Sequence, residues 1–248
     1  MAFITGGGRG IGRACAERLA RAGFAVAIGG RSRAHLDQTV AAIGGDALAI
    51  DLDVTNEASV ADAFDRAQRE LGKVSVLVNN AGIALSSSFA KTSLADFERT
   101  LAVNLTGAFL CARAALPGML QARSGRIINI ASTAARMGFR YTAAYCASKH
   151  GLLGLTRALA LEVAQKGITV NAVCPGWTET EMLHGSIENI RSATGKSAED
   201  AREALARMNP MGRIIKPEEV AELVAYVASE AAAAVTGQAL GVDGGEAM

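Results

Sequence analysis

The sequence predicts a doubly wound α/β fold: one domain over residues 1–248, with a parallel sheet of seven strands and helices on both faces. Two observations predict it. Short apolar runs alternate six times with helical stretches before a last apolar run near the C-terminus. This alternation is typical of parallel strands joined by right-handed crossovers. The first apolar run leads into a glycine-rich turn and then a helix, and neither a linker nor a repeat interrupts the 248 residues.

The expected strands are apolar runs of four to six residues, the kind of run that forms a buried strand. In chain order they are Ala2–Thr5, Phe24–Gly29, Ala47–Ile50, Val74–Val78, Arg126–Ala131, Thr169–Val173 and Ala239–Val242.

The stretches between these strands carry apolar residues at helical spacing. The expected helices are Arg13–Ala22, Ser32–Gly44, Asn56–Leu71, Ser93–Leu120, a run to Lys166 that contains Tyr145, and Lys216–Ser229. The last helix begins at Pro217 with acidic residues, which is a favoured helix start. The segment Glu181–Ile214 is more polar and is expected to form two short helices. Because it follows the carboxyl end of a strand, we expect it to cover the ligand cleft.

Composition excludes several classes of protein. Hydrophobic residues make up 50% and charged residues 20%, and the net charge is +1. This balance does not indicate a nucleic acid or membrane partner. No apolar run is long enough to span a membrane, and the N-terminus enters a strand at once, without room for a signal peptide. The wide spacing of the cysteines and histidines predicts no metal site and reduced cysteines in a cytoplasmic protein.

The glycine turn reads T-G-G-G-R-G-I-G over Thr5–Gly12. A strand, a glycine turn and a helix together are the setting of a dinucleotide-binding Rossmann unit. Gly6, Gly10 and Gly12 have no side chains, so the backbone can approach a pyrophosphate, and the helix N-terminus stabilises its charge.

The residues after the second expected strand favour NADP(H) over NAD(H). Gly30 stands where an NAD-selective fold usually has an acid on the ribose 2′-hydroxyl. Arg31 follows it, and Arg9 lies in the glycine turn. Two guanidinium groups without a carboxylate suit a 2′-phosphate. Either arginine is otherwise a solvated surface charge.

Further polar residues lie where a cofactor crosses the sheet edge. Asp53 is placed either to hydrogen-bond an adenine or to cap the helix that follows Thr55. The sequence N-N-A-G over Asn79–Gly82 ends the fourth expected strand. Asn104 interrupts a long helix, where a buried asparagine needs either a backbone partner or an ordered water.

Ser132, Tyr145 and Lys149 carry the candidate chemistry. Ser132 follows a strand, while Tyr145 and Lys149 are four residues apart and share one helix face, with Cβ atoms ~5–6 Å apart. We expect the ammonium group to lower the phenol pKa from its usual value of about 10. Such a phenol exchanges a proton with an alcohol or carbonyl oxygen, which a serine hydroxyl can hold. The alternative for an isolated Y-x-x-x-K is a surface Tyr/Lys pair.

Together, these motifs resemble those of the classical short-chain dehydrogenases/reductases over essentially the whole chain. The matching segments are Thr5–Gly12, Asn79–Gly82, the Asn104 segment, Ser132, Tyr145–Lys149, Pro175–Thr180 and the closing V-D-G-G. The resemblance implies that Tyr145 is the general acid/base and that Ser132 orients the substrate oxygen. It also implies that Lys149 lowers the Tyr145 pKa and binds the nicotinamide ribose, and that Asn104 holds a proton-relay water.

The expected cofactor site combines the glycine turn with residues at the ends of the later strands, and Thr180 is expected to meet the nicotinamide carboxamide. Its members are Gly6, Arg9, Gly10, Ile11, Gly12, Arg31, Asp53, Val54, Asn80, Ala81, Gly82, Tyr145, Lys149, Pro175, Gly176 and Thr180.

Within that family, G-R-I-I-N-I-A-S-T-A-A and G-I-T-V-N-A-V-C-P-G resemble 3-oxoacyl-thioester reductases and ketoreductases of aromatic polyketide synthesis. This favours an NADP(H)-dependent reductase that converts a 3-oxoacyl thioester of CoA or a carrier protein to the 3-hydroxyacyl thioester. One alternative is a dehydrogenase of a small non-thioester alcohol (a hydroxy acid, sugar or cyclic alcohol), for which NAD is also open as the cofactor. Another is a dinucleotide-sensing regulator, which is expected to lack part of the catalytic set.

A thioester substrate brings expectations for the cleft. Trp177, Met182 and Leu183 are expected to contact the acyl group. Cations at the cleft mouth are expected to meet the phosphates of the carrier, and the candidates are Arg136, Arg140, Arg191, Arg202, Arg207 and Arg213. The resemblance also suggests a homotetramer. The helices Leu94–Leu120 and Tyr145–Lys166 carry more apolar positions than one sheet face covers, which is typical of an interface.

Overall fold

The structure, a computed structural model, describes residues 1–248. Its sheet has seven parallel strands in the order β3-β2-β1-β4-β5-β6-β7. They are β1 (Ala2–Thr5), β2 (Val26–Gly30), β3 (Ala47–Asp51), β4 (Val76–Asn79), β5 (Gly125–Ile130), β6 (Ile168–Pro175) and β7 (Ala239–Val242). The predicted α/β fold is confirmed, and the strand ends differ from the expected ones by at most two residues.

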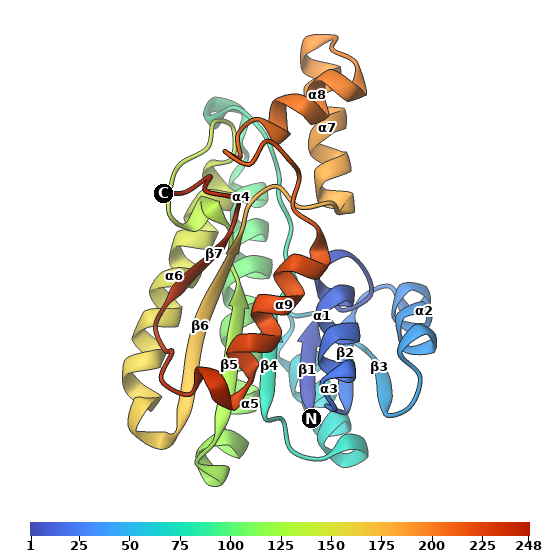
Figure 1. Ribbon diagram of the computed structural model, residues 1–248, viewed down its shortest axis with the longest axis vertical. Coiled ribbons are helices and arrows are strands. Elements are labelled where there is room, and N and C mark those ends of the chain that lie inside the picture. The colour runs from blue at the N-terminus through green and yellow to red at the C-terminus, as the bar shows by residue number, and fades with distance from the viewer.

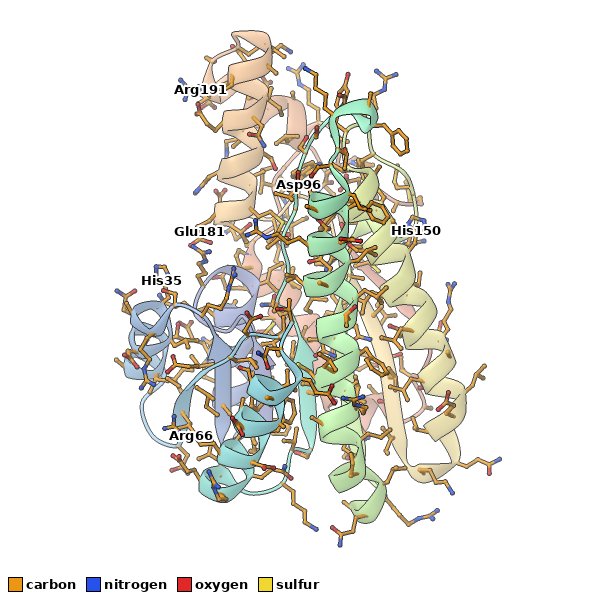
Figure 2. The ribbon with its side chains drawn as sticks, turned by 180° about the vertical axis from the view of Figure 1, so that it is seen from behind. His35, Arg66, Asp96, His150, Glu181 and Arg191 are labelled. Carbon is orange, nitrogen blue, oxygen red and sulfur yellow. The ribbon has the colours of Figure 1, made fainter.

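Helices cover both faces of the sheet. Helices α1 (Gly10–Arg21), α2 (Arg33–Ile43) and α9 (Pro217–Ala228) lie on the face toward the viewer in Figure 1. Helices α3 (Glu57–Leu71), α4 (Leu94–Leu101), α5 (Gly107–Ala122) and α6 (Ala143–Val163) lie on the other face, which Figure 2 shows from behind. This two-sided cover is what right-handed crossovers between parallel strands produce.

The two largest apolar clusters of the core lie one on each side of the sheet. Alternate residues of a strand point to opposite faces, and β1 shows the result. Ala2 and Ile4 belong to the cluster under α1 and α9, whereas Phe3 belongs to the cluster on the other side and stacks on Phe64 at 4.3 Å. All three β1 side chains are fully buried, so the first strand is anchored on both faces.

The chain order creates a crevice at the carboxyl ends of β1 and β4. From β1 the chain proceeds outward to β2 and β3, and then returns to pair β4 on the other side of β1. Ligands of open α/β sheets bind in the crevice outside such a switch point. In Figure 1 the C-terminus lies at this end of the molecule and the N-terminus at the opposite end.

Helices α7 (Glu181–Thr194) and α8 (Ala198–Ala206) form a hairpin that projects beyond the sheet (Figure 1). These are the two short helices expected between Glu181 and Ile214. Leu183, Ile187, Ala201 and Leu205 form a small apolar cluster inside the hairpin. Because the hairpin has its own apolar cluster, it is a packed unit. It lies above the crevice (Figure 1).

By length and composition alone, the continuous helical segment Leu94–Ala122 passes the test for a membrane span. The expectation from the sequence is that no apolar run has this length, and by length and composition this helical segment is an exception to it. In this fold, however, the α5 part of that segment packs against β4 and β5. The same composition is found in the core helix of a sheet layer.

Candidate active site

Ser132, Tyr145 and Lys149 meet beyond the carboxyl end of β5. Ser132 follows that strand, and its Oγ accepts a hydrogen bond from the Ala134 backbone N–H at 3.1 Å. The Ser132 side chain also hydrogen-bonds the Tyr145 phenol. Lys149 is buried, its Nζ donates to the Ile130 carbonyl oxygen at 2.7 Å, and it lies 5.7 Å from the centre of the Tyr145 ring. The surface Tyr/Lys alternative is therefore wrong, because Lys149 is 4% exposed and bonded to the last residue of β5.

The pKa of Tyr145 shifts in the direction opposite to the expected one. Burial raises it to about 12, and the hydrogen bond from Ser132 opposes only part of that shift. Burial also lowers the pKa of Lys149 to about 8. The Lys149 ammonium donates to the Ile130 carbonyl rather than to the phenol. In the protein alone, desolvation therefore dominates the Tyr145 pKa, and its net shift is upward. The lowering contribution expected from Lys149 stays a prediction.

Asn104 lies in a π-helical turn, Ala102–Thr106, that joins α4 to α5. Its Oδ1 accepts from the Ile83 backbone N–H at 2.8 Å, and its Nδ2 donates to the Ile83 carbonyl at 2.9 Å and to Ser148 Oγ at 3.0 Å. Turns of this kind are frequent at functional sites. Of the two partners expected for Asn104, the structure shows the backbone one. The relay water stays a prediction.

The glycine turn leaves an open helix terminus. Gly6 and Gly10 have φ values of 65° and 54°, in the left-handed region that glycine adopts without strain. Helix α1 follows with Arg9 as its N-cap, without a side-chain cap or an acidic residue in the first turn. The free N–H groups and the helix dipole stabilise a negative charge there. These residues fit the pyrophosphate of a dinucleotide.

Thr5 and Asn80 tie the glycine turn to the end of β4. Asn80 Nδ2 donates to the carbonyl oxygens of Thr5 and Gly6 at 2.9 and 3.1 Å. Thr5 Oγ1 accepts from the backbone N–H groups of Asn80 and Ala81, both at 3.0 Å. Asn80 therefore positions the turn. Sequence reasoning missed the role of Thr5, although a hydroxyl directly before a glycine turn is a signal for it.

The segment after β6 closes the opposite side of the crevice. Thr180 Cγ2 lies 3.0 Å from the point where a Cβ on Gly10 would be, so the two segments touch. Pro175 and Gly176 lead into this contact from the end of β6. In Figure 2 the labelled Glu181, the residue after Thr180, lies at the base of the hairpin above the glycine turn.

The remaining expected cofactor residues lie on the same edge. Gly82 is close to both Asn104 and Lys149, since a Cβ there would be 3.3 Å from Asn104 Oδ1 and 3.7 Å from Lys149 Nζ. Ile11 is in the first turn of α1, and Val54 packs against Gly107. The expected residues of the β1, β4 and β5 ends are thus brought together.

Gly30 ends β2 and is followed by Arg31. Arg31 and Arg9 of the glycine turn are both exposed and are in none of the twelve ion pairs of the structure. The nearest atom to a Cβ on Gly30 would be Leu36 Cδ2 at 3.5 Å, so the site has room for a side chain. The neighbouring Arg33 is paired with Asp37.

Asp53 forms a local turn. Its Oδ1 accepts from the Thr55 backbone N–H at 2.9 Å and from Thr55 Oγ1 at 2.7 Å. The Thr55 hydrogen bonds, with a smaller contribution from the Arg31 charge, lower the Asp53 pKa. Helix α3 is capped by Asn56, so the expected cap role of Asp53 is wrong. Its contact with an adenine stays a prediction.

Most of the expected substrate-side cations already have partners. The four arginines of the hairpin region form the pairs Arg191–Glu188, Arg202–Glu179, Arg207–Glu203 and Arg213–Glu219. Figure 2 shows Arg191 near the outer end of the hairpin. Arg136 and Arg140 are exposed and unpaired in the loop between Ser132 and Tyr145. These two are the cations left for an anionic substrate group.

The three residues expected to contact the acyl group differ in their exposure. Leu183 is 1% exposed inside the hairpin cluster, so it has no surface to offer a substrate. Trp177 packs against the same cluster while remaining partly exposed. Met182 is 41% exposed and remains available.

Known proteins are similar to this chain over its full length. A family model described as enoyl-(acyl carrier protein) reductase matches residues 6–246. A 3-oxoacyl-[acyl-carrier-protein] reductase from Synechocystis sp. is 39% identical, over 100% of this chain and 97% of that protein. A cis-4-hydroxycyclohexanecarboxylate dehydrogenase from Sinomonas cyclohexanicum is 40% identical, over 99% of this chain and 95% of that protein.

A solved structure agrees with the fold in detail. The crystal structure of an actinorhodin polyketide ketoreductase variant with NADPH has a TM-score of 0.96 and 39% sequence identity. The match covers 99% of this chain and 96% of that one. With the glycine turn, the Ser–Tyr–Lys set and these matches, the chain belongs to the short-chain dehydrogenase/reductase family of NAD(P)-dependent oxidoreductases that act on CH–OH groups.

Proposed function

We propose that this protein is an NADP(H)-dependent reductase that converts a 3-oxoacyl thioester to the 3-hydroxyacyl thioester. The observation that carries the reaction type is the meeting of Ser132, Tyr145 and Lys149 beside an open glycine turn. A dinucleotide-sensing regulator does not need these three side chains. Because all three are present, we favour an enzyme.

The chain's own residues handle the oxygen. The bound cofactor supplies a hydride to the carbonyl carbon, or accepts one in the reverse direction. Ser132 holds the substrate oxygen by a hydrogen bond. The Tyr145 phenol, whose pKa burial raises to about 12, donates its proton to that oxygen as negative charge develops on it. Lys149, which donates to the Ile130 carbonyl oxygen and lies close to Gly82, would bind the nicotinamide ribose.

The proposed preference for NADP(H) rests on the ribose end of the crevice. Arg9 and Arg31 are unpaired, and Gly30 offers no carboxylate to repel a phosphate. Charge-assisted hydrogen bonds from guanidinium groups are the usual way to hold such a phosphate. The similarity to a ketoreductase structure with NADPH supports the same choice.

The proposed thioester substrate rests on Arg136 and Arg140, which face solvent without ion-pair partners. CoA and the phosphopantetheine of a carrier protein both carry phosphate groups that such cations bind. The names of the relatives also include acyl-carrier reductases.

A small cyclic alcohol is the second candidate substrate, because a 40% identical relative is a dehydrogenase of a hydroxycyclohexanecarboxylate. Its carboxylate would use the same two arginines. Initial rates with acetoacetyl-CoA, 4-oxocyclohexanecarboxylate and cyclohexanone, each with NADPH and NADH, test the proposal. We expect the highest kcat/KM for acetoacetyl-CoA with NADPH, and a preference for either cyclic ketone would replace the thioester assignment.

A further inference from the structure

The turn after β7 contains a pair of carboxyl groups that the catalytic set does not use. Asp243 Oδ1 accepts from the Gly245 backbone N–H at 3.0 Å, and its Oδ2 accepts from the Ala247 backbone N–H at 3.2 Å. These bonds fold residues 243–247 into a compact turn. Glu246 lies in that turn, and its side chain is only partly exposed.

Glu246 is packed against the segment that follows β6. Its Oε2 lies 2.5 Å from the point where a Cβ on Gly176 would be, so the carboxyl group lies directly against this glycine. On the other side of the turn, Gly244 is in close contact with the Asn209 side chain, and a Cβ on Gly245 would lie 3.3 Å from Pro210. The turn therefore joins two segments, the one that carries Gly176 and the one that leads out of the hairpin.

Both carboxyl oxygens of Glu246 are buried and have no hydrogen-bond partner within normal geometry. The Trp177 backbone N–H lowers the Glu246 pKa, but by less than burial and the Asp243 charge raise it. Among the charged groups of the packed segments, Glu179 is paired with Arg202 and with His184, and Arg213 is paired with Glu219. Asp243, a second carboxylate, is the charged group that acts on Glu246.

An ionised Glu246 therefore has no compensating cation. Burial, and then the charge of Asp243, raise its pKa to about 7. A protonated carboxyl group packs against the Gly176 segment without an unpaired charge. An ionised one repels Asp243 and is stabilised by leaving for water, which removes a contact from the Gly176 segment.

We propose that Glu246 is a positioning residue for the cofactor, which holds the Gly176–Thr180 segment against the glycine turn only while its carboxyl group carries a proton. This inference rests on the proposed function, because Gly176 and Thr180 are its proposed cofactor residues. The protein would then bind its cofactor more weakly as pH rises through neutrality.

The size of the effect follows from the protonated fraction. If only the protonated form binds, apparent affinity scales with that fraction. For a group that titrates near pH 7, the apparent cofactor Kd at pH 8 is about tenfold higher than at pH 6. Glu246→Gln keeps the shape and cannot ionise, so it should lose this contribution.

The test compares the wild type with Glu246→Gln, and with Glu246→Leu as a second uncharged variant. NADPH Kd values are measured by fluorescence titration at pH 6 and pH 8. Glu162→Gln, which removes an exposed acid from the far end of α6, is the matched control. Lys149, with its pKa lowered to about 8, contributes equally to all four proteins, so the difference between them isolates Glu246.

Thermal unfolding without cofactor gives a readout that does not depend on the proposed function. The folded-state pKa of Glu246 is about 7, above its ordinary value of 4.5, so its contribution to stability is lost as pH rises from about 4.5 through about 7. Glu246→Gln should therefore melt at a higher temperature than the wild type at pH 8, with a smaller difference at pH 6.

Two outcomes support the proposal together: a Kd ratio between pH 8 and pH 6 that falls about tenfold in Glu246→Gln, and a stabilised variant at pH 8. An unchanged Kd ratio in both Glu246 variants overturns it. If NADPH and NADH fail to bind at all, the proposed function falls. The melting curves then still decide whether Glu246 titrates in the turn.

Discussion

The phenol of Tyr145 is protonated at neutral pH, and desolvation raises its pKa further from its ordinary value, to about 12. A neutral phenol is the form that can give a proton to a developing alkoxide. Lys149 is itself desolvated and donates to the Ile130 carbonyl oxygen, and the lowering effect expected from its charge stays a prediction. From sequence, the pair and its spacing are visible, whereas the balance between burial and charge is not.

Tyr145→Phe removes the proton donor and almost no volume. Turnover should fall by on the order of 10²–10⁴-fold, the usual contribution of a positioned general acid, while NADPH binding persists. Steady-state rates and fluorescence titration measure the two effects. Tyr141→Phe, which removes a 62% exposed phenol from the neighbouring loop, is the control and should change neither. A Tyr145→Phe protein with near-normal turnover would refute the catalytic assignment.

Substitutions at Gly30 and Arg31 test the proposed preference for NADP(H) over NAD(H). Gly30→Asp with Arg31→Ser introduces a carboxylate where there is room for it and removes a guanidinium group. The ratio of kcat/KM for NADPH to that for NADH should fall by on the order of 10- to 100-fold, the worth of hydrogen bonds to a charged group. Arg33→Ser, which removes an arginine already paired with Asp37, should leave the ratio unchanged. A wild type that prefers NADH contradicts the assignment.

Individual elements show why some boundaries are predictable and others are not. The run Thr169–Val173 predicts β6, but the strand extends to Pro175 because β7 pairs with its last residues. Such a pairing depends on a strand more than sixty residues later. The glycine turn is predictable because its glycine spacing is local. The ties from Thr5 and Asn80 are not, since they join segments 75 residues apart.

The loop between β5 and α6 should recognise the anionic end of the substrate. Arg136→Ala and Arg140→Ala should each raise KM for acetoacetyl-CoA about two- to fivefold, the range for an exposed ion pair. KM for cyclohexanone should stay constant, and added salt should reduce the difference by screening. Arg191→Ala, which removes a paired arginine near the outer end of the hairpin, is the matched control. Equal effects on both substrates would refute a phosphate contact.

At the scale of the whole molecule, the far face of α4, α5 and α6 carries exposed apolar side chains. Leu94 is 70%, Phe109 43% and Leu161 84% exposed. Apolar surface of this kind on a helical layer is typical of an interface, and closed symmetry is the common solution. We therefore expect a homotetramer, with a light-scattering mass about four times that of one chain at micromolar concentration. A monomer mass would rule the assembly out.

The fold class follows from the sequence because the alternation of apolar runs and helices leaves few topologies. The place of the hairpin above the crevice does not follow from the sequence, since it depends on how Leu183 and its neighbours pack. For the same reason the sequence does not separate free arginines from paired ones. Arg202 and Arg140 are both candidate substrate-side cations in the sequence, but of the two only Arg202 pairs with a carboxylate, that of Glu179.

The central claim is that the site reduces a thioester ketone with NADPH. The most direct measurement is kcat/KM for acetoacetyl-CoA against free acetoacetate, with the same enzyme, NADPH concentration and ionic strength. The two substrates share the reacting ketone and differ in the phosphate-bearing carrier. We predict a clearly higher kcat/KM for acetoacetyl-CoA, with a difference that shrinks as salt is added. Equal values, or a higher value for free acetoacetate, would contradict the claim and favour a small-alcohol dehydrogenase.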